Sequence, residues 1–286
     1  MGPTRRKRRL GRYMKAVRQQ ASPELKPEQV ADLAQTTRQT VTRMEAGAAL
    51  PRIHLFAAIL NVIGATDEQR AQATRLWEIA DADTTTIEHG DLPLKYRAFR
   101  MDESEAIRER TLNTVVVPGM LQIPAYAAAI WSAARNRIQH LDYEERAVAE
   151  RRDRQSLLYR EENPLQLHSL IDEAALRRMI GGPAVMIEQL DHLLAMSARP
   201  TVTIQVLPFE IGAYDAMSGP VTLLGFPEDD EPDTAYLEYV FGGESVEDVD
   251  AVAALTAIWE ELADTAPTAE ESAAIIRSIR DAVRAR

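Results

Sequence analysis

The sequence of 286 residues contains no cysteine. This absence excludes disulfide bonds, thiolate nucleophiles and cysteine-ligated zinc, and it is typical of proteins from a reducing cytoplasm. No stretch approaches the roughly 18 consecutive apolar residues of a membrane-spanning helix. The charged N-terminus is not followed by the apolar segment of a signal peptide. We therefore expect a soluble, cytoplasmic protein.

Residues that carry enzymatic chemistry are also sparse. Lys95 is the only lysine after Lys26, which argues against a self-cleaving Ser/Lys pair. The five histidines show no metal-ligand spacing such as H-E-x-x-H, and there is no P-loop, G-x-G-x-x-G or G-x-S-x-G motif. His168 and Asp172 could share one face of a helix as a general base and its orienting partner, whereas a strand over residues 167–171 would separate them. We expect no enzyme activity, no cofactor and no bound metal.

The net charge of the chain is −11, but its two parts differ in sign. Residues 1–80, the head, hold 14 Lys and Arg against 7 Asp and Glu, whereas residues 81–286 hold 19 against 37. Because phosphate attraction requires only a local basic patch, the acidic whole does not exclude a nucleic-acid partner for the head. Residues 81–93, rich in Asp and Thr, are predicted to link the head to residues 94–286, the body.

Residues 36–47, TTRQTVTRMEAG, predict a short amphipathic helix. Either Thr36 or Thr37 can cap its start, and Gly47 can end it. Its apolar side carries Val41 and Met44, and its polar side carries Arg38, Gln39, Thr42 and Arg43. This polar side has two cations and no carboxylate, so it suits the DNA major groove, where Arg pairs with guanine and Gln with adenine. These four residues and Thr37 are the candidate DNA contacts of the helix. An ordinary surface helix is the alternative.

A second short helix is predicted immediately before, over residues 27–35, PEQVADLAQ, with Val30 and Leu33 on its apolar side. This pair of helices resembles the lambda-repressor/Cro-like (XRE-type) helix-turn-helix family. The matching residues are Gln29, Ala31, Thr37, Val41, Thr42, Arg43, Glu45 and Gly47. Gln35 stands where the family commonly has Gly, which predicts a strained turn. The resemblance covers about residues 8–64 and implies a sequence-specific DNA-binding domain that acts as a dimer.

The rest of the head is predicted to complete a five-helix domain. The basic run over residues 5–9 is expected to form an extended arm, because its charges repel one another. Such an arm can lie along phosphates or enter a minor groove. Its candidate DNA contacts are Arg6, Arg8 and Arg9. A helix is expected from Leu10 with Arg18 on its outer side, and further helices over residues 50–64 and 66–80.

The body has a mixed pattern. Period-3.6 stretches predict helices over 95–112, 123–136, 142–160, 172–180, 183–198, 245–262 and 269–284. Alternating stretches predict three strands over 201–207, 221–226 and 234–241. We therefore predict a mainly α protein whose body is an α/β or α+β domain with a small sheet packed on helices.

Four phrases of the body resemble the C-terminal domain of the WhiJ-like regulators of actinobacteria. They are VVPGMLQIPAYA (116–127), RRDRQSLL (151–158), IDEAALRRMIGG (171–182) and IQVLPFEIGAYDAMSGPVTLLGF (204–226). The resemblance implies a transcriptional regulator, sometimes described as antitoxin-like, whose gene often lies beside one for a small acidic partner protein. The C-terminal domain of these regulators has no settled biochemical activity.

The loop over residues 209–220, between two predicted strands, is a candidate binding site because glycines interrupt the strands there. The side chains expected to contact a ligand or partner are Tyr214, Asp215, Met217 and Ser218. A plain connector is the alternative. The three arginines Arg151, Arg152 and Arg154 are expected to form surface ion pairs or to bind an acidic partner.

These patterns predict a one-component transcriptional regulator that binds a double-stranded DNA operator as a homodimer. Its body is expected to sense a small-molecule effector or a partner protein. The alternative is an antitoxin-like module that holds a small acidic partner protein and autoregulates its operon. An enzyme with a DNA-targeting head is the least supported reading.

Overall fold

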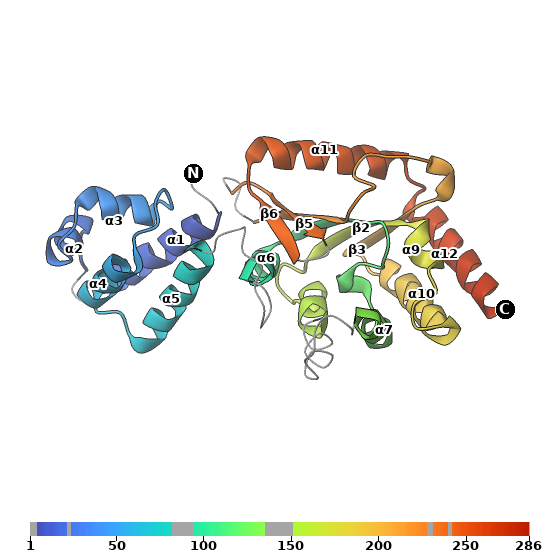
Figure 1. Cartoon of the computed structure of the whole chain (residues 1–286), viewed down its shortest axis with the longest axis horizontal. Coiled ribbons are helices and arrows are strands. Elements are labelled where there is room, and N and C mark those ends of the chain that lie inside the picture. Colours follow the sequence, from blue (N-terminus) through green and yellow to red (C-terminus); the bar gives the residue numbers. More distant parts are fainter. Residues whose placement is uncertain are drawn as a thin grey trace. The chain divides into compact units, whose positions relative to one another are not determined.

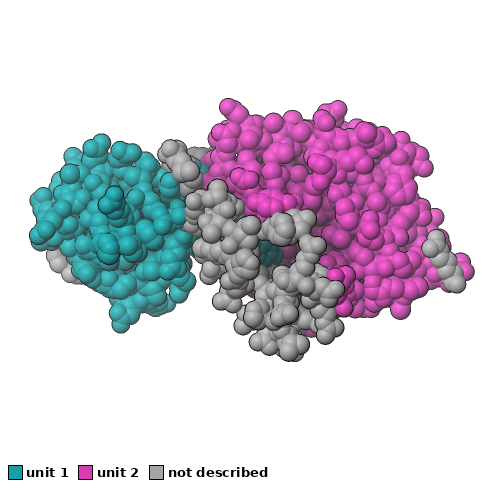
Figure 2. Space-filling model, in the orientation of Figure 1, with its two compact units in different colours: residues 1–98 teal, residues 99–286 magenta. Residues whose placement is uncertain are grey.

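The computed structural model describes residues 5–21, 24–81, 94–134, 151–227, 231–239 and 242–285. The chain divides into two compact units, Met1–Ala98 and Phe99–Arg286, which Figure 2 shows in different colours. The predicted linker, apart from Asp81, lies outside the described residues.

Within its described residues the head contains five α-helices, as predicted; Figure 1 labels them. They are α1 (Arg5–Gln20), α2 (Pro27–Leu33), α3 (Arg38–Glu45), α4 (Ile53–Ile63) and α5 (Asp67–Asp81). Pro27 takes the first position of α2, where a helix does not need its missing N–H. Thr66 and Gln69 form a capping box at the start of α5. The Gln69 N–H donates to Thr66 Oγ1 (3.2 Å), and the Thr66 N–H donates to Gln69 Oε1 (3.0 Å).

The core of the head combines apolar side chains from all five helices. The buried apolar residues include Leu10, Met14, Val17, Val30, Ala31, Val41, Met44, Phe56, Ile59, Leu60, Ile63, Ala73 and Leu76. Trp77 stacks on Phe56, and its indole N–H donates to the Pro51 carbonyl (2.9 Å). Leu33, predicted to face inward, is 64% exposed because α2 ends at that residue and the chain turns away.

The basic run at the N-terminus is helical, so the prediction of an extended arm is wrong. α1 begins at Arg5 rather than at Leu10. Successive side chains point about 100° apart around a helix, which separates neighbouring cations, and Arg and Lys have high helix propensity. Arg5 is 1% exposed, and Arg6, Arg8 and Arg9 are partly buried.

The body is built on one six-stranded mixed sheet with the strand order β3-β2-β1-β4-β5-β6. Its strands are β1 (Arg108–Asn113), β2 (Gln166–Asp172), β3 (Val202–Leu207), β4 (Val221–Gly225), β5 (Thr234–Tyr239) and β6 (Gly242–Val246). β1, β2 and β3 are parallel, whereas β4, β5 and β6 continue from β1 in antiparallel pairs. In the register, Thr111 of β1 lies between Ser169 of β2 and Thr222 of β4.

Helices cover both faces of this sheet (Figure 1). They are α6 (Leu94–Glu105), α7 (Pro124–Ala134), α9 (Glu173–Arg177), α10 (Pro183–Ser197), α11 (Val249–Thr265) and α12 (Ala269–Arg284). In Figure 1, α11 lies on one side of the sheet, and α6, α7 and α10 lie on the other. Under α11, Leu112, Leu170 and Leu223 of the sheet pack with Trp259 and Leu262 of the helix. α12 packs against α10 and the edge strand β3.

The predicted sheet packed on helices is confirmed, but it has six strands rather than three. The second half of the helix expected over residues 95–112 is wrong, because Arg108–Asn113 form the central strand β1. Alternate residues of a strand face opposite sides of its sheet. In β1 the buried residues include Glu109 and Thr111 as well as Leu112, so the strand lacks the usual apolar alternation.

The structure also decides one alternative and shifts two other boundaries. Residues 167–171 belong to strand β2, which was one of the two alternatives. The helix expected from residue 245 begins at Val249, because Gly242–Val246 form strand β6. Within the expected helix over 142–160, residues 151–156 are helical and Leu157–Tyr159 form a 3-10 turn, while residues 142–150 lie outside the described residues.

Candidate functional site

Thr37 caps helix α3, which decides between the two candidate caps. Thr37 Oγ1 accepts a hydrogen bond from the Thr40 N–H (3.1 Å). The side chain of Gln39 is therefore not needed for a capping box with Thr36, and it is exposed. Gln35, in the turn between α2 and α3, has a φ of 53°. This left-handed conformation disfavours residues other than glycine, so the strained turn predicted at Gln35 is confirmed.

The inner side of α3 packs closely on α1. Val41 and Met44 are buried, as predicted. A Cβ atom added to Gly11 of α1 would lie 2.5 Å from the carbonyl oxygens of Met44 and Glu45. Only glycine allows the two helices to approach this closely. The close crossing of the two helices therefore fixes the distance between α3 and α1.

An ion pair fixes the C-terminal end of α3. The guanidinium group of Arg18 donates from Nε and Nη2 to the two carboxylate oxygens of Glu45, at 2.6 and 3.0 Å. Its Nη1 donates to the Leu25 carbonyl (2.7 Å). The side chains of Arg18 and Glu45 are only 6% and 9% exposed, and the carboxylate raises the pKa of Arg18. The expectation that Arg18 lies on the outer side of its helix is wrong, because Glu45, which is distant in sequence, neutralises it.

The outer side of α3 presents the predicted polar residues to solvent. Arg38, Gln39 and Arg43 are exposed, and Thr42 is partly buried. The Thr42 hydroxyl lies 3.1 Å from the Arg38 carbonyl and 3.2 Å from the Gln39 carbonyl, within the same helix. Of the predicted contacts, Thr37 and Thr42 thus have local hydrogen bonds. Arg38, Gln39 and Arg43 are the long side chains that project outward.

Two neighbours flank this outer side. Arg38 Nε lies 2.8 Å from Glu28 Oε1, and both side chains are well exposed, at 68% and 48%. A Cβ atom added to Gly47 would lie 2.5 Å from the backbone of Arg8, which places the basic start of α1 beside the end of α3. Sequence reasoning did not find the Glu28 contact, because it depends on how α2 crosses α3.

The candidate loop of the body, residues 209–220, divides into inward and outward side chains. The Tyr214 hydroxyl donates to Asp172 Oδ2 (2.6 Å) at the end of β2, and burial together with this carboxylate raises the pKa of Tyr214. Asp215, Met217 and Ser218 are exposed. Tyr214 therefore holds the loop against the sheet, and the other three predicted residues form its outer surface.

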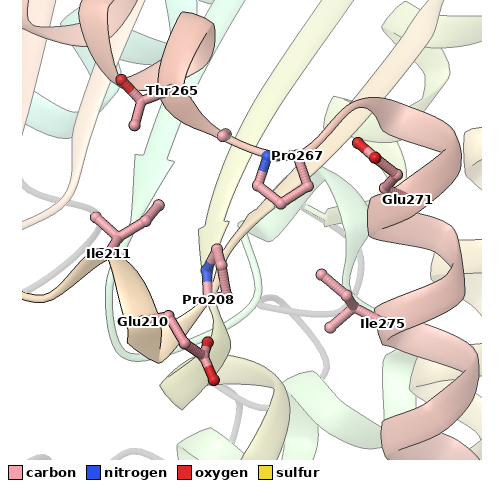
Figure 3. Close-up of a pocket in the computed structure, with 8 residues that line it drawn as sticks. Pro208, Glu210, Ile211, Thr265, Pro267, Glu271 and Ile275 are labelled. Atoms are coloured by element: carbon pink, nitrogen blue, oxygen red, sulfur yellow. The ribbon is translucent and has the colours of Figure 1, made fainter.

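A shallow, wide-open hollow of about 710 Å³ lies beside the start of this loop (Figure 3). It is lined by Pro208, Glu210, Ile211, Thr265, Ala266, Pro267, Glu271 and Ile275. Figure 3 shows Glu210 and Ile211 on one side and the α12 residues Glu271 and Ile275 on the other. The lining carries two carboxylates, and it does not include the four side chains predicted from the loop.

The possible catalytic pair of His168 and Asp172 is separated. Both belong to strand β2, where four residues span about 13 Å. His168 Nε2 lies 2.6 Å from Gln205 Oε1, and its ring meets Trp259 edge-on at 4.7 Å. Burial lowers the pKa of His168. The histidine is part of the packing between the sheet and α11.

The arginines predicted to form surface ion pairs are largely engaged inside the body. Arg154 donates to Glu103 of α6 from Nη2 (2.6 Å) and Nε (3.0 Å), with both side chains nearly buried. Arg151 Nε donates to Gln122 Oε1 (2.7 Å). The expectation of a surface cluster is therefore wrong for Arg154. Arg152 is exposed.

Helices α2 and α3 with this exposed cationic and amide surface define a helix-turn-helix protein of the DNA-binding regulator class. A family model described as a helix-turn-helix domain matches residues 9–73. The model described as domain of unknown function (DUF5753) matches residues 96–278, and the chain belongs to this family. No curated protein and no solved structure matched the chain. Among the described residues, none of the helices has the length and apolar character needed to cross a membrane.

Proposed function

We propose that the chain is a sequence-specific transcriptional regulator that places α3 in the major groove of double-stranded DNA. One observation carries this proposal. Arg38, Gln39 and Arg43 project from a helix whose inner side is buried and whose two ends are fixed, by the Thr37 cap and by the Glu45 ion pair. A rigid helix can present such donors to base edges with a defined geometry.

The start of α1 supplies the contacts to the DNA backbone in this proposal. Arg8 lies beside Gly47, directly after the recognition helix. Arg6 and Arg9 belong to the same first turns of α1. Cations at this position can neutralise phosphates that flank the groove. Their removal should weaken binding to all sequences alike and reduce its salt dependence.

We further infer that the body senses a small ligand or a partner protein and mediates dimerisation. The exposed Asp215, Met217 and Ser218 on a loop held by Tyr214 support a regulatory surface there. The resemblance to WhiJ-like regulators points to a small acidic partner, but two observations favour other effectors. The adjacent hollow carries carboxylates, and Arg154 is already paired with Glu103.

In vitro selection from a random double-stranded DNA library tests the DNA-binding proposal with the full chain. We expect enrichment of a two-fold symmetric site with half-sites about 10 base pairs apart, or a multiple of that spacing. Arg38→Ala and Arg43→Ala should each weaken binding to the selected site by roughly 5- to 150-fold. Arg277→Ala, which removes an exposed arginine of α12 in the body, is the matched control and should bind like the wild type. The proposal fails if the wild type enriches no sequence.

A further inference from the structure

Glu28 is a negative side chain beside the helix that is proposed to read DNA. It occupies the second position of α2, and its Oε1 lies 2.8 Å from Nε of Arg38, the first residue of α3. A carboxylate so close to a DNA-binding surface repels phosphates. The contact with Arg38 would explain why a carboxylate is placed at this surface.

Both residues start from fixed points of the backbone. The Lys26 N–H donates to Gln29 Oε1 (2.8 Å), which fixes the first turn of α2 around Glu28. Thr37 caps the first turn of α3 just before Arg38. An arginine side chain has many rotamers in solution, and each contact that it makes reduces this freedom. The ion pair therefore selects among the orientations of Arg38 before DNA arrives.

The nearest approach of the pair is at Nε, the inner nitrogen of the guanidinium group, which lies 2.8 Å from Glu28 Oε1. The two terminal nitrogen groups lie further out along the Arg38 side chain. These two groups can donate in one plane to O6 and N7 of guanine. The same carboxylate opposes a swing of Arg38 toward a phosphate, because the phosphate would approach Glu28.

We propose that Glu28 is a positioning residue that directs Arg38 to a guanine and away from the DNA backbone. The inference rests on the proposed function of α3. In the free protein the pair is exposed and contributes little to folding. At a DNA interface from which water is excluded, the same pair interacts more strongly. Glu28 therefore determines base preference rather than stability.

The experiment compares full-length Glu28→Ala and Glu28→Gln with the wild type. Each protein is subjected to the same in vitro selection, and then to titrations with the selected site and with scrambled DNA at several salt concentrations. The wild type should prefer guanine at one position of each half-site, and Arg38→Ala should lose this preference. A good bidentate contact favours the correct base over a wrong one by roughly 5- to 150-fold. We expect the guanine preference of Glu28→Ala to be lower than that of the wild type by a factor on the order of 3 to 10, because only part of the contact is lost.

In the same variant, affinity for scrambled DNA should rise while the guanine preference falls. Without Glu28, Arg38 can reach a phosphate, so affinity for scrambled DNA should rise and the salt slope should steepen by about one unit. Glu28→Gln keeps the length of the side chain and an amide oxygen but loses the charge. It should retain more of the guanine preference than Glu28→Ala while also binding scrambled DNA more tightly.

Asp32 provides the matched control, because it lies one turn further along α2, is exposed and carries the same charge. Asp32→Asn should raise affinity for all DNA slightly and leave the guanine preference unchanged. A double-mutant cycle adds a second check: in the Arg38→Ala background, Glu28→Ala should no longer alter base preference. Thermal unfolding of each variant, expected to match the wild type, separates these effects from misfolding.

The outcomes distinguish this inference from the proposed function. If the wild type enriches no site, DNA reading by α3 is wrong. If the wild type reads guanine through Arg38 but Glu28→Ala and Glu28→Gln keep the same preference, the positioning role is wrong and DNA binding stands. An equal loss of preference in Asp32→Asn would also overturn the positioning role, because it would show a general effect of charge.

Discussion

The ion pair between Arg18 and Glu45 gives a quantitative prediction for the stability of α3. Arg18→Ala removes the donors at 2.6, 2.7 and 3.0 Å and leaves Glu45, whose side chain is 9% exposed, without its partner. Breaking one side of a buried ion pair costs about 3–5 kcal/mol. We expect the lower end of this range, because water can enter the space left by the truncated arginine. A loss of about 3 kcal/mol corresponds to a change on the order of 100-fold in an opening equilibrium.

Hydrogen exchange measured by mass spectrometry suits this prediction, because it reports on peptides of the full chain separately. Peptides covering α3 should exchange on the order of 100-fold faster in Arg18→Ala. Peptides of β1 and β2 in the body should be unchanged. Lys15→Ala removes an exposed cation from the same helix and should have little effect. Glu45→Gln keeps the size and an acceptor, so its effect should be smaller than that of Glu45→Ala.

A change of less than about fivefold in the α3 peptides of Arg18→Ala would refute this reasoning, since about 1 kcal/mol is typical of an exposed pair. The double variant Arg18→Ala with Glu45→Ala provides an independent test. Because it leaves no unpaired charge, it should be less destabilised than the sum of the two single variants.

Three further predictions concern single positions. Gln35→Gly should stabilise the head by up to about 1 kcal/mol in thermal unfolding, because it relieves the positive φ of 53°; no gain would mean that Gln35 makes compensating contacts. Burial lowers the pKa of His168, so the histidine takes up a proton at a higher pH in the unfolded state than in the folded state. The contribution of His168 to the stability of the body should be full above about pH 6.5 and should decline as the pH falls toward the pKa of the folded state. His168→Gln should reduce this dependence of stability on pH. Tyr214→Phe removes the bond to Asp172 and should destabilise the body by about 1 kcal/mol, whereas Asp215→Ala should leave its stability unchanged and alter only the regulatory response of a reporter operon.

Helix α3 could be predicted from the sequence because its signals are local. A cap, a period of 3.6 and a terminal glycine all lie within residues 36–47. The contacts that fix it could not be predicted in the same way. Glu45 lies 27 residues from Arg18, and its partner depends on how α1 crosses α3. The same reason applies to the pair of Glu28 and Arg38.

The body was harder to predict because its central strand carries polar residues. Glu109, Thr111 and Ser169 are buried on the sheet, and the hydroxyl oxygens of Thr111 and Ser169 are 2.5 Å apart. A strand that hides charged and hydroxyl side chains does not show the apolar alternation by which strands are identified. β3, β4 and β5, which have more apolar residues, were predicted close to their observed positions.

The strand order of the body has a consequence for how the chain folds as it is synthesised. The helices of the head are complete by Asp81, and helical domains fold faster than sheets. β1 occupies the middle of the sheet, yet its partner β2 begins at Gln166, and its other partner β4 begins only at Val221. One edge of β1 therefore stays unpaired until β4, and with it most of the body, has left the ribosome. We expect the head to fold while the sheet is still open, and a chain that stops before β4 to expose a strand edge that favours aggregation.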